Sequence, residues 1–320
     1  MDGNSGLTIW ALGAHHFLEV TARDRGAIVS AMADLKQLVA FEQKFDLLIE
    51  NLMEFERELL DRSLTMNMRG FQSAHDLQDD QLAFARRLLN VMSAARTYVD
   101  HVKHHMSAMH PSEAAVSERV TGLFSERYDA SLDYRTMEAL RNYSQHRGMP
   151  VHGFVYEPRW IDGEGHGDSR RLEANVRIRL NPAVLREDGG FKAAVLEELE
   201  ASDNELDLKA TVRRYVEDLG SVHLALRAMV KERSDAAREA LTEWRTRYAE
   251  ASGAESIVGL ALVDRTSVGG TKHVTGMSET PLGYLDRLLR RNSALTNLSA
   301  RSVSSRVLPP KSRPVESVGR

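Results

Sequence analysis

Residues 25–66 read RGAIVSAMADLKQLVAFEQKFDLLIENLMEFERELLDRSLTM, and this stretch decides the fold. Its apolar side chains recur every three to four positions, with charged side chains between them, which is typical of an amphipathic helix. These apolar positions are Ile28, Met32, Leu35, Leu38, Phe45, Leu48, Leu52, Phe55 and Leu59. The stretch therefore predicts one long amphipathic helix.

A second apolar stripe with the same period follows a break around Gly70. It runs from Leu82 to Met106 and ends near Pro111. We therefore expect a second long helix that packs antiparallel against the first.

Two shorter helices are expected next. Pro111 is well suited to the start of a third helix, which continues through Phe124. Asp129 or Ser131 can cap a fourth helix, and Gly148 ends it.

The pattern changes after residue 150. Residues 151–156 and 172–180 alternate apolar with polar side chains around a Gly/Asp loop, which predicts a β-hairpin. Helical patterns return in residues 191–200 and 206–251. A short strand at residues 257–263 is expected to join the hairpin.

The expected fold is mainly α, an antiparallel helical bundle with a small inserted β-hairpin or three-stranded sheet. After a last helix at residues 281–295 the chain becomes rich in Ser, Arg and Pro, and such a segment cannot bury enough apolar surface to fold. The expected segments are a helical bundle at 20–147, a β-hairpin insertion at 148–185, a C-terminal helical part with one short strand at 186–299, and a disordered basic tail at 300–320.

Composition excludes several chemistries. The chain has no cysteine, so disulfides, thiolate nucleophiles and cysteine zinc sites are ruled out. The apolar run from Leu7 to Val20 lacks the cationic start of a secretory signal. No uncharged segment approaches the roughly 20 residues that cross a bilayer as a helix. We expect a cytoplasmic protein that does not associate with membranes.

The most informative polar segment is Met137–Gly148, MEALRNYSQHRG, at the end of the fourth expected helix. On a helical wheel its polar residues point away from the apolar face. They are Glu138, Arg141, Asn142 and Gln145. Asn142 and His146 are four residues apart and therefore neighbours, so the amide can orient the imidazole by a hydrogen bond.

Arg141 and His146 lie about 140° apart around an ideal helix. Their charged ends can meet through the long arginine side chain, through unwinding of the helix end, or through a second subunit. A histidine exchanges protons near neutral pH, and a guanidinium binds phosphate through a planar fork of donors. The segment thus combines groups suited to phosphate chemistry.

This segment resembles the Arg-x4-6-His motif of HEPN domains, in the form where a polar residue directly follows the arginine. Arg141, Asn142 and His146 match that form. The resemblance covers at most residues 27–147, and it also fits a bundle with two long antiparallel helices first and the motif on a later helix. It implies a HEPN-like bundle within residues 20–147.

The resemblance implies a metal-independent endoribonuclease without a cofactor, in which His146 moves a proton and Arg141 stabilises charge on the phosphate. The nucleophile would be the RNA's own 2′-hydroxyl, and two motifs would meet across a homodimer. HEPN proteins often act as toxins or in phage defence, which implies an antitoxin or regulatory partner. Secondary contacts to RNA are assigned to Arg147, His152, Gln145 and Glu138.

The Arg-x4-6-His spacing alone also occurs at Arg96–His101, Arg147–His152, Arg69–His75 and Arg159–His166, and only Arg141 adds the asparagine and the helical context. Two alternatives to a catalytic site stay open. The polar end of the fourth helix can also be a solvated surface whose cations suit the helix dipole. The rival function is a noncatalytic module that binds a partner protein through the long helices.

A metal site is not expected. His101, His104 and His105 have a spacing that can place two imidazoles on one metal ion, but Asp100 is the only acid within the cluster. No His-Glu-x-x-His pattern occurs in the chain. A solvent-facing helix explains the three histidines.

Overall fold

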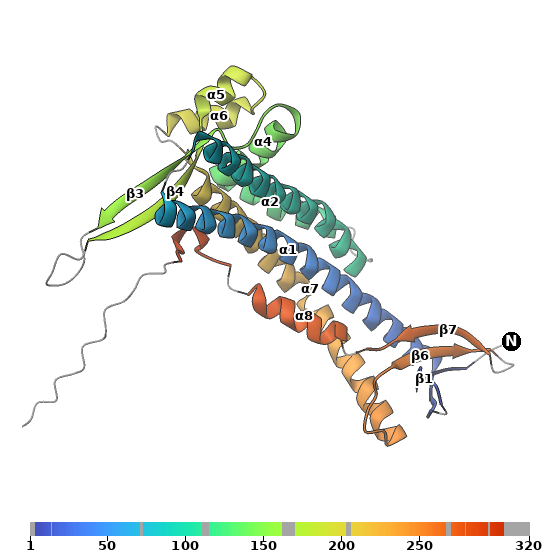
Figure 1. The fold of residues 1–320 in the computed structure, drawn as a ribbon. Helices are drawn as coiled ribbons and strands as arrows, with labels where there is room; N and C mark the ends of the chain where they lie inside the picture. The colour runs from blue at the N-terminus through green and yellow to red at the C-terminus, as the bar shows by residue number, and fades with distance from the viewer. Residues whose placement is uncertain are drawn as a thin grey trace, which may run out of the picture.

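This computed structural model describes the whole chain except residues 1–3, 14, 71–72, 111–114, 162–169, 203–205, 267–269, 279, 294 and 304–320. The described part contains eight α-helices, 69% of its residues are helical, and two small antiparallel sheets lie at opposite ends of the helices (Figure 1). The prediction of a mainly α fold with an inserted sheet is confirmed.

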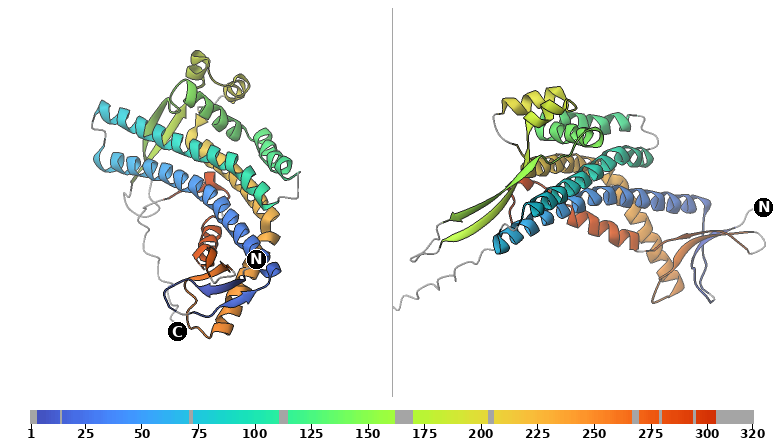
Figure 2. Two further views of the ribbon diagram at one scale, coloured as in Figure 1. Left: turned by 90° about the vertical axis from the view of Figure 1, so that its right-hand side faces the viewer. Right: turned by 45° about the horizontal axis from the view of Figure 1, so that its top comes forward.

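Two long helices dominate the molecule. Helix α1 (Ala22–Arg69) and helix α2 (Ala74–Met109) lie side by side and run in opposite directions (Figures 1 and 2). Thr21 caps α1 by accepting a hydrogen bond from the amide of Asp24, and Ser73 caps α2 in the same way. Most of the apolar positions seen in the sequence form the interface between the two helices and belong to one hydrophobic core. Leu82, where the second stripe was expected to begin, is instead 57% exposed.

Helices α3 (Val116–Ala130) and α4 (Leu132–His146) pack next to α2, as expected. Helix α7 (Leu208–Ser252) completes the bundle by running along α1 and also contacting α2, α3 and α4. It continues without a break through Gly220. The core therefore unites segments that are far apart in the chain.

The inserted hairpin consists of strands β3 (Gly153–Ile161) and β4 (Arg171–Leu180), which pair in antiparallel register. Strand β5 (Leu206–Asp207) adds to β4 and makes a three-stranded sheet. Helices α5 (Pro182–Asp188) and α6 (Ala193–Ala201) connect β4 to β5 and lie beside α4.

The expectation that residues 257–263 join this hairpin is wrong. Strand β6 (Leu260–Arg265) instead lies in a second sheet of order β2-β1-β6-β7, with β1 (Ser5–Ile9), β2 (Leu18–Val20) and β7 (Thr271–Gly276). Helix α7 begins directly after β5 and has 45 residues. At 1.5 Å per residue it carries the chain about 68 Å away from the hairpin, so β6 pairs with the N-terminal strand.

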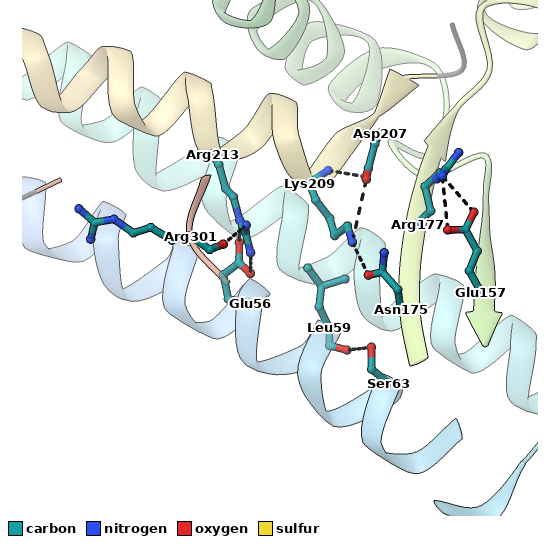
Figure 3. A network of polar contacts seen from close by, with 10 residues as sticks. All are labelled: Glu56, Leu59, Ser63, Glu157, Asn175, Arg177, Asp207, Lys209, Arg213 and Arg301. Atoms are coloured by element: carbon teal, nitrogen blue, oxygen red, sulfur yellow. Dashed lines mark hydrogen bonds and ion pairs between the residues drawn. The ribbon is translucent and has the colours of Figure 1, made fainter. Parts of the chain in front are cut away.

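Polar contacts fasten the hairpin and the C-terminal segment to the bundle (Figure 3). Arg213 on α7 forms two hydrogen bonds with Glu56 on α1, at 2.7 and 2.6 Å, and also donates to the carbonyl of Arg301. Lys209 donates to the side chain of Asn175 on β4 at 2.8 Å, and burial lowers the pKa of this lysine. These polar groups are all paired, which indicates a structural role.

Helix α8 (Thr280–Arg291) follows β7 and packs on α1, and the short 3-10 helix η1 (Leu298–Ala300) packs on α7. The predicted tail at 300–320 lies almost wholly outside the described residues. None of the described helices combines the length and apolar character that crossing a bilayer requires.

Candidate active site

Helix α4 carries the motif, and its inner face is fully embedded. Ser131 caps the helix by accepting a hydrogen bond from the amide of Tyr134 at 3.2 Å. The buried side chains are Tyr134, Thr136, Met137, Ala139, Leu140 and Tyr143. Asp133 forms an ion pair with Arg214 on α7. These contacts fix the rotation of α4 and leave Asn142, Gln145 and His146 exposed.

The C-terminal end of α4 is held by Tyr143. Its hydroxyl donates to the carboxylate of Asp188 at the end of α5. Burial, together with this carboxylate, raises the pKa of Tyr143 to about 12, so the phenol keeps its proton at neutral pH. A side chain at Gly148 would overlap the Tyr143 ring, so the chain can turn away from α4 there only without one.

Arg141 and Asn142 contact each other. The Nη1 group of Arg141 donates to the Asn142 side-chain oxygen at 3.2 Å. Because Asn142 and His146 lie on neighbouring positions of one helix face, this bond draws the guanidinium toward that face. On an ideal helix of 3.6 residues per turn, the two ends of the motif lie about 140° apart. The arginine side chain reaches across part of this angle.

His146 is exposed in the last turn of α4, and Asn142 is exposed one turn earlier. Within the described part of the chain, no hydrogen bond joins His146 to Asn142 or to Arg141. The structure therefore brings Arg141 and Asn142 together and leaves the imidazole on the same face, open to solvent.

The four secondary residues differ in their surroundings. Glu138 accepts a hydrogen bond at 2.7 Å from the hydroxyl of Tyr215 on α7. The helical wheel had placed Glu138 away from the packed face, and that placement is wrong, because α7 covers this side of α4 as well. Gln145 and Arg147 are exposed. The aliphatic part of Arg147 crosses Gly190, where a side chain would collide with it.

His152 lies half-buried just before β3. Its Nδ1 atom accepts a hydrogen bond from the amide of Asn181 at 3.2 Å, which places the proton of the neutral ring on Nε2. Its ring meets the ring of Tyr143 edge-on, with 6.1 Å between the centroids. Burial lowers its pKa, so the neutral form is favoured.

The competing match at Arg96–His101 has a different environment. Arg96 forms an ion pair with Asp100 at 2.7 Å, so its guanidinium is already engaged by a carboxylate. Arg141 has no such ion pair among the residues that the structure describes. Of these two matches, Arg141 to His146 is the one whose guanidinium is not held by a carboxylate.

A second histidine–arginine cluster lies in the centre of the bundle. His223 on α7 is fully buried, and Glu42 on α1 is 2% exposed. Arg227 donates two hydrogen bonds to the Glu42 carboxylate, at 2.8 and 2.6 Å. The His223 ring lies 3.2 Å from the same carboxylate through Nε2 and 3.0 Å from the Tyr98 hydroxyl through Nδ1.

This central cluster resembles a proton relay, but substrate cannot reach it. Burial lowers the pKa of His223, although Glu42 opposes the shift. Burial raises the pKa of Glu42, but the hydrogen bonds from Arg227 and His223 outweigh it, and the pKa stays below its ordinary value. Phe45 stacks on the His223 ring at 3.9 Å between centroids. A sealed and fully paired cluster of this kind stabilises the bundle.

His101, His104 and His105 lie near the C-terminal end of α2. His105 is 2.9 Å from the side chain of Gln37 through Nδ1, and burial, followed by the nearby His104, lowers its pKa. Among the described residues, no group of three or more His, Asp or Glu side chains is arranged to hold a metal ion.

Sequence reasoning missed the residues that hold the site in place. Asp188 lies 45 positions after Tyr143, and Tyr215 lies 77 positions after Glu138. No local pattern links such pairs, because their contact depends on how α5 and α7 pack against α4. Gly148, by contrast, was visible as the end of the helix.

No protein-family model, curated protein or solved structure matches this chain. The assignment of the α4 end as a site therefore depends on its own residues and geometry.

Proposed function

We propose that this chain is a metal-independent endoribonuclease of the HEPN type that acts as a homodimer. The observation that supports this most directly is the hydrogen bond from Arg141 to Asn142 at 3.2 Å, which turns the guanidinium toward the helix face of His146. His146 itself is exposed to solvent. In the proposal, a phosphate binds between the guanidinium of Arg141 and the imidazole of His146.

In the proposed reaction the neutral His146 takes the proton of an RNA 2′-hydroxyl. The 2′-oxygen then bonds to the adjacent phosphorus, and the bond from phosphorus to the 5′-oxygen breaks. The leaving oxygen receives a proton from an imidazolium, which is His146 of either copy in the dimer. Arg141 balances the additional negative charge on the phosphate. The products carry a 2′,3′-cyclic phosphate and a 5′-hydroxyl, and no water is consumed.

Around this reactive set, Arg147 offers a further cationic group to an RNA backbone. His152 is withdrawn from the proposal, since its Nδ1 atom accepts from the Asn181 amide and its Nε2 atom is buried. Gln145 is an exposed neutral donor on the same helix turn as His146. Glu138 is withdrawn from the proposal, since its carboxylate is bonded to Tyr215 and would repel phosphate. We extend the proposal to a cytoplasmic toxin or phage-defence effector restrained by an antitoxin or regulatory protein, which the family resemblance alone supports.

The test is cleavage of structured and single-stranded RNA by the purified full chain in the presence of a chelator. Wild type is expected to cleave and to leave 2′,3′-cyclic phosphate ends. His146→Ala is expected to lose about 10²- to 10⁴-fold in rate, the usual contribution of a positioned acid or base. His101→Ala is the matched control, because it removes a histidine at the same spacing from an arginine.

Equal cleavage by wild type and His146→Ala would exclude the proposed role. Loss of activity on chelation, or products ending in a 3′-hydroxyl, would point to metal-dependent hydrolysis. A loss in His101→Ala equal to that in His146→Ala would show that the effect is not specific to α4.

A second candidate function is a noncatalytic module that binds a partner protein. One observation favours it: α1 presents a row of exposed apolar side chains along one face of its C-terminal half. They are Met53, Leu60, Leu64 and Met68, with exposed fractions of 43, 45, 54 and 73%. Two results together would support this second function. The chain would not cleave RNA, and Leu64→Glu would abolish its binding to a partner protein.

A further inference from the structure

An apolar groove lies along the N-terminal half of α1, toward the end of the bundle where β6 and β7 lie (Figure 1). Its volume is about 650 Å³, within the usual size of sites for small organic ligands. Helix α7, strand β7 and the segment that leads into α8 form its other walls. The apolar walls include Val29, Met32, Val39, Leu241, Met277 and Leu282.

The groove has two cationic side chains, Lys36 and Arg245, and one imidazole, His273. No carboxylate of the described residues lines it. Lys36 is exposed and makes no ion pair within the described residues. Arg245 is buried in the wall, where it donates to the carbonyl of Met277 at 2.6 Å.

The start of α8 adds to this positive character. Pro281 and Leu282, in its first turn, line the groove, and that turn contains no acidic residue. The first amides of a helix lack partners inside the helix and carry partial positive charge, although Pro281 has no N–H to contribute. A long apolar wall with an edge of positive charge complements a molecule that has an apolar chain and one acidic headgroup.

We propose that this groove binds a small amphipathic anion, of the class of medium-chain fatty carboxylates. The chain lies against α1 and α7, and the carboxylate faces Lys36. Burial of the chain supplies most of the affinity, and the lysine selects the sign of the headgroup. This site is independent of the α4 end and of the ribonuclease proposal.

The test compares two ligands of equal chain length and opposite charge. Titration calorimetry of the full chain with decanoate is expected to show saturable binding of one molecule per chain. Decyltrimethylammonium is expected to bind at least tenfold more weakly, which corresponds to about 1.4 kcal/mol. Equal affinity for both ligands, or no binding of decanoate, would overturn the proposal.

Two variants locate the site. Ala33 is an exposed residue of α1 that lines the groove, so Ala33→Phe fills the groove without replacing a core side chain. It is expected to weaken decanoate binding more than tenfold. Lys36→Glu is expected to weaken it about tenfold and to reduce the preference for the anion. The control Lys103→Glu, on α2, is expected to leave both affinities unchanged.

Thermal melts of the four proteins show whether each variant is folded, and Lys36→Glu tests the proposal even if Ala33→Phe is unstable. Anionic phospholipid vesicles are titrated separately. Binding to vesicles without binding to free decanoate would identify a membrane surface as the partner and would overturn the proposed small-molecule site.

Discussion

The end of α4 and the centre of the bundle both place a histidine close in sequence to an arginine, in opposite surroundings. At the centre, His223 and Arg227 share the Glu42 carboxylate, and the imidazole is completely buried. At the end of α4, Arg141 bonds to the neutral side chain of Asn142, and His146 is open to solvent. The same two side-chain types therefore stabilise the fold in the centre of the bundle and remain available for chemistry at the end of α4. The difference is the buried carboxylate, which pairs with both side chains in the centre and has no counterpart among the described contacts at the end of α4.

The largest expected effect separates the two regions by stability. Glu42→Ala leaves Arg227 without its buried counter-charge and should lower the free energy of unfolding by roughly 3–5 kcal/mol. Glu54→Ala removes a carboxylate whose side chain is 45% exposed and should cost about 1 kcal/mol or less. Urea denaturation measures both changes.

His146→Ala should change the unfolding free energy by no more than about 0.5 kcal/mol, as is usual for an exposed side chain. A loss comparable to that in Glu42→Ala would mean that His146 supports the fold, and the contrast between the regions would fail.

Gly148→Ala should sharpen the contrast by disturbing the α4 end alone. The added methyl group overlaps the Tyr143 phenol and displaces it from Asp188. We expect a loss of about 1–3 kcal/mol of unfolding free energy, as for other overpacked sites, together with weaker RNA cleavage. Both are measured on the same preparation.

The control for this variant is Gly122→Ala on α3, where a methyl group meets nothing within 4 Å. Alanine in the interior of a helix is favoured over glycine by roughly 0.5–1 kcal/mol, so this change should stabilise the protein. If Gly148→Ala stabilises it by the same amount, the chain after α4 is loose and the described contacts do not hold the site.

The last effect concerns pH. Burial holds the pKa of His223 below its ordinary value of 6.5, so the unfolded chain binds a proton before the folded chain does as the pH falls below 6.5. The unfolding free energy should therefore decrease with falling pH, by at most about 1.4 kcal/mol per pH unit from this group. His223→Phe should give a shallower decrease between pH 7.5 and 5.

His105 and His152 also have lowered pKa values and contribute with the same sign, so the informative quantity is the difference between wild type and His223→Phe. Titration of Glu42 below pH 4.5 adds a further loss, because its folded-state pKa is depressed, and the measurement stays above that range. If the unfolding free energy changes equally with pH in wild type and in His223→Phe, water reaches His223 and the centre is not sealed.

Much of the helical architecture was predictable from local pattern. The apolar period of residues 25–66 identified α1, and of the two caps considered for α4, Asp129 and Ser131, the structure has Ser131. The alternation after residue 150 identified β3 and β4. Strands β1 and β2 were missed. The partner of β6 was assigned wrongly, because strand pairing depends on contacts across more than 200 residues of chain.

The candidate site shows the same division. Arg141, Asn142 and His146 were found from their order in the sequence, and their helix was located correctly. The roles of Glu138 and Asp188 were not, because both bond to residues that packing alone brings near. A helical wheel describes one helix, and it cannot include the second helix that covers its polar side.

By itself, the sequence determined the helices, their ends and the order of polar groups along α4, since these depend on side-chain spacing and on caps within a few residues. Only the tertiary structure decided which histidine–arginine pair is sealed and which is open, which sheet receives β6, and where an apolar groove acquires an edge of positive charge. Burial and charge pairing arise from segments that meet across the fold, and no local stretch of chain contains both partners.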